Sequence, residues 1–390
     1  MIWKIALAVF LLISNNGCNA RNNLFLHGGN VNDDDHPVLR RFVDAAGGIG
    51  EARIAVITMA SEMAVENGEF YTQMFLEIGA ADATWIPITM DNSADLADDP
   101  EIAAMIRSNT GVFFGGGDQG RIINGIIHPD GSDTLVFEAI RDVFAIGAVG
   151  GTSAGTACQS DGFAIAGGRS YEAWANPVCT SNDCGNTDDL SYYPSGLGFA
   201  YKIITDSHFG ERVREGRLMK LMFEARNPQL YGIGVDESTA LLIWDVVGTA
   251  GGVTIIDNFA ADYDPIAPSA AGVRFTYLTE GDTASLVTGN IEIASWKTNL
   301  AGQELHDTAL ESNDIFSESS GTPGGEFRYV ATQLFDSKVR SSTSVTHTKK
   351  PQFEVIMIKD ANSAGFGGYS PTTSEFVISY ANLRVDISAI

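Results

Sequence analysis

Short apolar segments alternate with amphipathic ones through the first half of the chain. Residues 23–29, 53–58 and 111–114 are apolar segments typical of β-strands; the first two end at glycine and threonine, and a glycine run follows the third. Segments 37–46 and 69–79 have the helical period. Strands that alternate with helices predict a parallel sheet covered by helices on both faces. We therefore expect an α/β fold with a doubly wound, mostly parallel sheet.

The pattern changes beyond about residue 245. Segments 272–278, 353–358 and 376–378 are short and apolar, as in β-strands, whereas residues from about 300 to 325 are rich in Gly, Ser, Asp and Asn. We expect a main domain over 21–300, then a linker and a β-rich C-terminal extension over 301–390. The pattern assigns no function to this extension.

The most informative motif is Gly151-Thr152-Ser153-Ala154-Gly155. It follows the apolar run 143–149 and precedes small residues, an order that predicts strand, tight turn and helix. A G-x-S-x-G turn holds the serine hydroxyl above the sheet, and the amide of Ala154 can then help to bind an oxyanion. The alternative is a chance match, because the chain contains 42 glycines.

A catalytic serine needs a base and an orienting acid. Among six histidines, His208 stands out because it ends an apolar, β-branched run over 203–209. Asp236 and Glu237 follow another short apolar strand, and either acid could orient the imidazole. The alternatives are a structural histidine and solvated turn carboxylates. The order Ser, His, acid also differs from that of the α/β-hydrolases.

The glycine run at 115–117 is a second candidate for the site. It lacks the GK[ST] ending and the G-x-G-x-x-G spacing, which argues against nucleotide binding. A glycine turn that brings the amide of Gly117 beside Ser153 explains the run better and supplies a second oxyanion donor.

Charge narrows the choice of partner. The formal net charge is −25, with 49 acidic and 24 basic residues. This charge argues against nucleic acid or an anionic membrane as a partner, and the favoured explanation is that it keeps the protein soluble. Between 202 and 226, however, six basic residues outnumber four acidic ones. Arg212, Arg214 and Arg217 could bind substrate carboxylates through bidentate guanidinium contacts. The alternative is helix-surface pairing of Glu211, worth only about 0.3–0.5 kcal/mol.

The N-terminus predicts export. Residues 1–20 have a basic start and a short apolar stretch, as in a secretory leader, while Cys18 allows lipoprotein processing as an alternative. In an exported chain, Cys179 and Cys184 are candidates for a disulfide. Their spacing also suggests metal, but no neighbouring histidine or second cysteine pair supports that reading.

Taken together, the motifs over about residues 24–245 resemble the cyanophycinase and aspartyl dipeptidase family of serine peptidases. The matching segments are Leu26-His27-Gly28-Gly29, Phe114-Gly115-Gly116-Gly117-Asp118-Gln119-Gly120-Arg121, Gly151–Gly155, Asp206-Ser207-His208-Phe209 with the arginines that follow, and Gly232–Ala240. The resemblance implies a fold like that of class I glutamine amidotransferases. One departure is Ser207, where the family commonly has glutamine.

The same resemblance implies roles for individual residues. Ser153 would be the nucleophile, His208 the base and Glu237 the third member of the triad. Substrate binding would fall to Gln119, Asp206, Arg212, Arg214 and Arg217.

We therefore expect an exported serine peptidase, periplasmic, surface-bound or secreted, that needs no metal or organic cofactor. It would hydrolyse aspartate-rich peptides or cyanophycin to β-aspartyl-arginine. The alternatives are an aspartyl or isoaspartyl dipeptidase for short peptides and a non-catalytic surface binding protein on the same scaffold. A lipid anchor at Cys18 and a homodimer remain open.

Overall fold

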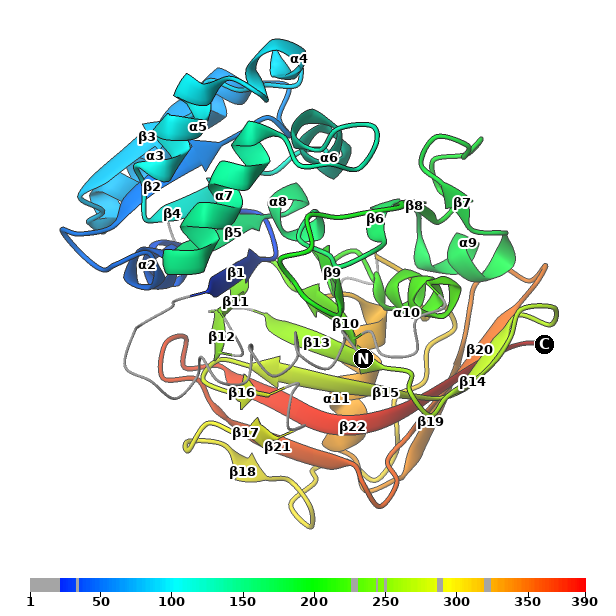
Figure 1. The fold of residues 1–390 in the computed structure, drawn as a ribbon. Helices are drawn as coiled ribbons and strands as arrows, with labels where there is room; N and C mark the ends of the chain where they lie inside the picture. The colour runs from blue at the N-terminus through cyan, green and yellow to red at the C-terminus, as the bar shows by residue number, and fades with distance from the viewer. Residues whose placement is uncertain are drawn as a thin grey trace, which may run out of the picture.

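The structure is a computed structural model that describes residues 22–32, 35–225, 231–242, 245–248, 251–285, 290–318 and 324–390. Two large mixed sheets with flanking helices make up most of it, which confirms the α/β class (Figure 1). The expected leader, including Cys18, lies outside the described residues. Within the described part, every helix is too short or too polar to cross a bilayer.

The first sheet contains the parallel strands expected from the N-terminal pattern. They lie in the order β3-β2-β4-β5-β1 and comprise β1 (Asn23–His27), β2 (Arg53–Ile57), β3 (Asp82–Trp85), β4 (Gly111–Phe114) and β5 (Ala148–Thr152). Beyond β1 the sheet continues with antiparallel strands β11 (Thr239–Leu242), β12 (Asp245–Gly248), β16 (Thr283–Ala284) and β17 (Ile291–Glu292).

Helices cover both faces of the parallel strands. One face packs against α2 (His36–Ala45) and α3 (Ala64–Ile78). The other face packs against α4 (Ser93–Leu96), α5 (Pro100–Arg107), α6 (Gln119–Ile126), α7 (Leu135–Ile146) and α8 (Ala154–Ala157). Successive residues of a strand point to opposite faces, so Ile54 joins the first core and Ala55 the second. This part of the fold is doubly wound.

The run 143–149 does not form one strand, as its composition suggested. Helix α7 continues to Ile146, Gly147 has φ −145° and ψ −129°, and β5 begins at Ala148. The last residues of α7, Ala145 and Ile146, are apolar although they are exposed, so composition shows no break between them and the buried strand that follows.

The second sheet is largely antiparallel. Its order is β18-β21-β22-β15-β13-β10-β9, with β9 (Ile203–Ser207) parallel to β10 (Tyr231–Val235). The other strands on this path are β13 (Gly252–Asp257), β15 (Ser269–Thr279), β18 (Thr298–Asn299), β21 (Ala364–Tyr369) and β22 (Phe376–Ala389). Three further strands belong to this sheet but lie off that path: β14 (Asp262–Asp264), β19 (Ser341–Val345) and β20 (Phe353–Ile358). A small separate sheet contains β6 (Ala164–Gly167), β7 (Cys179–Thr180) and β8 (Ser191–Tyr193). The expectation of a mostly parallel sheet is therefore wrong beyond the first five strands.

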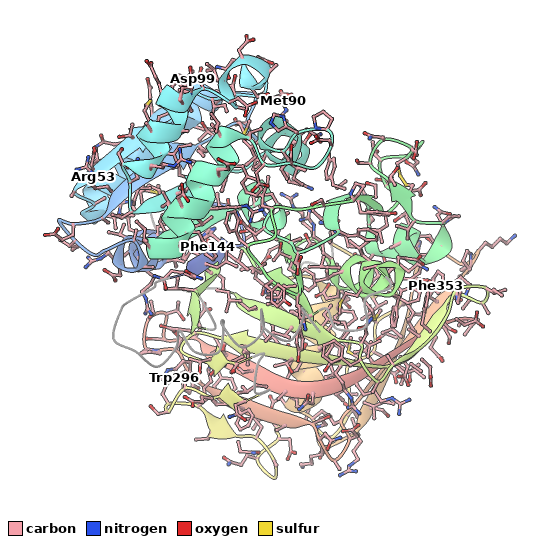
Figure 2. All side chains as sticks on the ribbon, in the orientation of Figure 1. Arg53, Met90, Asp99, Phe144, Trp296 and Phe353 are labelled. Carbon is pink, nitrogen blue, oxygen red and sulfur yellow. A yellow bond between two sulfur atoms is a disulfide. The ribbon has the colours of Figure 1, made fainter. Side chains whose placement is uncertain are left out.

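Residues before and after position 300 share one core. Strand β15 pairs with β22, and helices α9 (Ser170–Ala175), α10 (Glu215–Glu224) and α11 (Glu326–Phe335) pack on this sheet. Phe275 of β15, Phe353 of β20 and Leu383 of β22 are fully buried in the same cluster. Figure 2 labels Phe353 on the α9 side of the sheet, where its ring lies 5.9 Å from that of Tyr171.

Candidate active site

Ser153 occupies a sharp corner between β5 and α8. Its φ of 55° and ψ of −112° are uncommon for a residue with a side chain. A Cβ added at Gly151 or Gly155 would lie 2.6 Å or 2.3 Å from the carbonyl oxygen of Phe114 in β4. The turn therefore requires glycine at both positions, which explains the G-x-S-x-G spacing.

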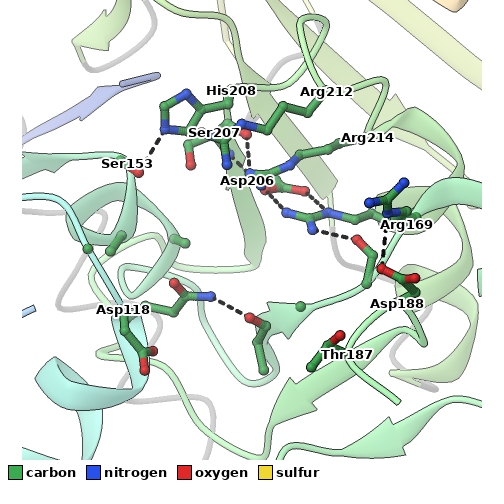
Figure 3. A pocket seen from close by; sticks show the side chains of 18 of the residues that line it. Asp118, Ser153, Arg169, Thr187, Asp188, Asp206, Ser207, His208, Arg212 and Arg214 are labelled. Atoms are coloured by element: carbon green, nitrogen blue, oxygen red, sulfur yellow. Dashed lines mark hydrogen bonds and ion pairs between the residues drawn. The ribbon is translucent and has the colours of Figure 1, made fainter. Parts of the chain in front are cut away.

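The corner brings Ser153 to His208 and, through it, to Glu237. His208 follows β9, and its Nε2 lies 2.8 Å from Ser153 Oγ (Figure 3). Its Nδ1 lies 2.6 Å from Oε1 of Glu237, which follows β10. The three groups thus meet at the carboxyl ends of β5, β9 and β10, the edge where open α/β sheets place their ligands.

The surroundings favour a neutral imidazole. Burial lowers the pKa of His208 below its usual range, and the charges of Arg212 and Arg214 lower it further, while the hydrogen bond to Glu237 opposes them. A neutral Nε2 can accept the proton of Ser153, and Glu237 would stabilise the imidazolium that results.

The glycines after β1 make room for this imidazole. Gly29 has φ 115°, and a Cβ there would lie 2.2 Å from Cε1 of His208. The backbone amide of His208 donates to the carbonyl oxygen of Gly28 at 2.7 Å. Behind them, His27 is fully buried and burial lowers its pKa to about 3, so it remains neutral. The segment Leu26–Gly29 therefore supports His208.

Two backbone amides are candidates for the oxyanion hole. Gly117 and Ala154 line the same cavity as Ser153. Within the described part of the chain, neither amide has a backbone acceptor, and Ala154 is the first residue of α8. Donors at a helix start are suited to a negative charge. Gly117 has φ 137°, and a Cβ there would lie 2.2 Å from the carbonyl oxygen of Ala60.

A cavity of about 580 Å³ opens beside Ser153. Of the residues that the sequence assigned to catalysis or substrate binding, the two candidate acids Asp236 and Glu237 do not line it. The others do: Gly117, Gln119, Ser153, Ala154, Asp206, His208, Arg212, Arg214 and Arg217 (Figure 3). Gln119 is held in place, because its Nε2 donates to the carbonyl oxygens of Ile165 and Ala166 at 2.5 and 3.0 Å.

The arginines and Asp206 form an ion cluster on one wall of the cavity. Arg217 contacts buried Asp206 through Nη2 at 2.6 Å and Nε at 2.8 Å, and Arg214 Nη1 lies 3.2 Å from the same carboxylate. Burial alone would raise the pKa of Asp206, but the charges of Arg217 and Arg214 hold it below its usual range. Arg212 is exposed and pairs with no acidic group in the described ranges. The wall therefore carries excess positive charge.

Several lining residues had no signal in the sequence. Arg169, Thr187, Asp188 and Glu318 reach the cavity from loops without a motif, and Arg169 Nε lies 3.1 Å from Oδ1 of Asp188. The same loop region contains a disulfide between Cys179 and Cys184. Among the described residues, no group of three or more His, Cys, Asp or Glu side chains is placed to hold a metal ion.

Comparisons with known proteins show the family to which this chain belongs. The model of peptidase family S51 matches residues 24–247. The chain is 32% identical to a cyanophycinase of Geminocystis herdmanii (strain PCC 6308) over 280 residues, which cover 67% of this chain and 93% of that protein. It is 34% identical to a cyanophycinase of Trichormus variabilis over 237 residues, covering 59% and 72%.

A solved structure of a peptidase from an acI-B1 Actinobacterium aligns with this chain at 19% identity and a TM-score of 0.47. The alignment covers 67% of this chain and 96% of that peptidase chain.

The family match spans the strands that carry Ser153, His208 and Glu237. The chain thus belongs to peptidase family S51 and is a serine-type peptidase.

Proposed function

We propose that this peptidase is a cyanophycinase-like hydrolase of aspartyl polymers, with Ser153, His208 and Glu237 as its catalytic triad. The observation that carries the proposal is the pair of short contacts, 2.8 Å and 2.6 Å, that join the three side chains beside an arginine-lined cavity. Cyanophycin carries arginine on aspartate side chains, so its units present both carboxylates and guanidinium groups.

The reaction follows from these contacts. Ser153 Oγ attacks the scissile carbonyl carbon while His208 Nε2 takes the hydroxyl proton. The amides of Gly117 and Ala154 bind the tetrahedral oxyanion. Nε2 then gives its proton to the leaving nitrogen as the C–N bond breaks and an acyl-serine remains. Water attacks this ester, His208 takes the water proton, and the acid product leaves as Ser153 regains its hydrogen.

A second cavity favours a polymer over a dipeptide. It has a volume of about 370 Å³ and shares Arg169, Arg212 and Glu318 with the first cavity, so the two cavities are adjacent. Glu172 and Glu318 offer carboxylates to a guanidinium, and Arg212 offers a guanidinium to a carboxylate. β-Aspartyl-arginine is the product we propose.

Replacement of the serine tests the triad. Ser153→Ala should lower the turnover of cyanophycin by on the order of 10⁶-fold, as loss of a nucleophile does in other serine peptidases. Ser195→Ala is the matched control, because among the described residues the hydroxyl of Ser195 donates only to the carbonyl oxygen of its neighbour Gly196. Retained turnover in a folded Ser153→Ala variant would refute the assignment.

The substrate is tested separately with the native enzyme. Release of β-aspartyl-arginine from cyanophycin should exceed cleavage of aspartyl and isoaspartyl dipeptides at equal concentration of susceptible bonds. The reverse preference would favour the short-peptide alternative. Turnover of neither substrate, with binding retained, would favour a non-catalytic role.

We also propose that the chain is exported and that its doubly wound part is related to class I glutamine amidotransferases. The disulfide between Cys179 and Cys184 and the sequence of residues 1–20 support export. Mass spectrometry of the mature N-terminus would distinguish cleavage after Ala20, lipidation at Cys18 and an uncleaved chain.

A further inference from the structure

A buried cluster of charges lies directly behind Glu237 and includes a side chain from far along the chain. Arg328 belongs to the first turn of α11, beyond the residues 24–247 that the family model matches. Its side chain is 11% exposed and forms an ion pair with Oδ2 of Asp236. The same Nη1 lies 3.4 Å from Oε1 of Glu211.

Asp236 directly precedes Glu237 and anchors the loop that carries it. Its carboxylate accepts hydrogen bonds at 2.9 Å from the amide of Gly210, from the amide of Gly252 and from the hydroxyl of Tyr277. With Arg328 as a further donor, this fully buried carboxylate has its charge matched. Asp236 therefore fixes the loop rather than orienting His208.

Glu211 holds Glu237 itself. Its Oε2 accepts a hydrogen bond from the backbone amide of Glu237 at 3.1 Å, while its Oε1 faces Arg328. Glu211 comes shortly after His208, so one guanidinium links the loop after β9 to the loop after β10.

The backbone before α11 leaves space for this guanidinium. A Cβ added at Gly324 would lie 1.2 Å from Nη2 of Arg328, and one added at Gly325 would lie 2.1 Å from the carbonyl oxygen of Gly210. Gly210 is two residues after His208. The C-terminal segment thus packs tightly on the loop that carries the imidazole.

We propose that Arg328 is a positioning residue for hydrolysis, because its guanidinium holds Glu211 and Asp236 together and so fixes Glu237 against His208. The inference rests on the proposed triad. Without the guanidinium, the buried carboxylate of Asp236 and the partly buried carboxylate of Glu211 would lie near each other without a cation, and the loop that carries Glu237 would shift or take up protons.

The pH profile reports this role. Burial raises the pKa of Glu211 to about 7, the charge of Asp236 raises it too, and Arg328 opposes them. Tyr277 from β15 and Glu215 from α10 also face the cluster. Ionised Glu211 is the form that pairs with Arg328, so activity should rise with pH through about 7. Removal of Arg328 should move that rise to higher pH.

The experiment compares kcat, KM and the pH profile of kcat on cyanophycin for four full-length variants. Arg328→Met removes the charge, and Arg328→Lys keeps it with fewer donors. Gly324→Ala keeps the charge but fills the space of the guanidinium. Glu211→Gln keeps an acceptor for the amide of Glu237 without a titrating group.

We expect kcat to fall by as much as about 100-fold in Arg328→Met and in Gly324→Ala, with KM little changed, since a displacement of 1 Å can cost that much. The acid limb of the profile, where kcat rises with pH, should move to higher pH in Arg328→Met and return part of the way to its wild-type position in Arg328→Lys. In Glu211→Gln the acid limb should move to lower pH, because it then reports the titration of His208.

The matched controls are Arg384→Met and Gly302→Ala. Arg384 pairs with Asp386, and Gly302 has a φ of 79°, close to that of Gly324, but a Cβ there would meet no atom within 4 Å. Both controls should keep the wild-type profile. An unchanged kcat and acid limb in Arg328→Lys, Gly324→Ala and Glu211→Gln would overturn the inference, even if Arg328→Met fails to fold. An active Ser153→Ala variant would instead overturn the triad.

Discussion

The arginines beside the catalytic histidine differ in how their charges are used. Arg217 and Arg214 are committed to Asp206, which is fully buried. Such contacts are costly to break, because breaking them would leave a buried carboxylate without a partner. Arg212 lines both cavities and pairs with no acidic group in the ranges described. It is therefore the guanidinium available to a substrate carboxylate.

Replacement of Arg212 should affect binding more than chemistry. A hydrogen bond to a charged group contributes about 1.5 kcal/mol, so Arg212→Gln should lower kcat/KM for cyanophycin about tenfold, mainly through KM. Arg107→Gln is the control, since Arg107 pairs with Asp142 on the helical face of the first sheet. Steady-state kinetics would measure both, and an unchanged KM for Arg212→Gln would contradict this role.

At the scale of elements, the site is a meeting of strand ends. Strands β1, β5, β9 and β10 each end in a loop that carries or supports a reacting group. The loop after β1 supports the imidazole in two ways: the carbonyl oxygen of Gly28 accepts a hydrogen bond from the amide of His208, and Gly29 leaves room for the ring. A methyl group there would compete directly with His208.

The pair Gly29→Ala and Gly48→Ala tests that contribution. Both glycines have positive φ, 115° and 97°, but a Cβ at Gly48 meets no atom within 4 Å. Each alanine should cost about 1 kcal/mol of stability through backbone strain. Only Gly29→Ala should also lower kcat, by about 100-fold, because it displaces the imidazole. Equal kcat values after correction for the folded fraction would contradict the steric argument.

The sequence predicted elements better than it predicted their partners. The sharp turn at Ser153 could be predicted because sterics allow few residue types in such a turn. The strand at 203–207 could be predicted because its apolar run is short and well bounded. The junction at Gly147 could not be found, since the exposed end of α7 is as apolar in composition as the buried strand β5. The contacts of Arg328 could not be found either, because an ion pair 92 residues apart leaves no local pattern.

At the scale of the whole molecule, the C-terminal strands complete a sheet that begins before residue 300. Strand β22 pairs with β15 along most of its length, and α11 packs beside it. The α/β class was predictable from alternation, but antiparallel closure by β22 was not, because periodicity does not say which strand a segment will join.

A chain that ends at residue 300 should therefore fail to fold independently. It would expose the edge of the 11-residue strand β15 and remove Phe353 and Leu383 from the shared core. We expect aggregation in size-exclusion chromatography and no cooperative thermal transition for residues 22–300, unlike residues 22–390. A monomer that melts cooperatively would show that the first 300 residues are autonomous.

The distance along the chain between Asp236 and Arg328 also has a consequence during synthesis. The ribosome adds these 92 residues in about 5–20 s. Throughout that interval the nascent polypeptide already contains its nucleophile, base and acid, but not the guanidinium that aligns them. On the role proposed for Arg328, Glu237 is fixed against His208 only after α11 has been synthesised and has packed on the loop after β9.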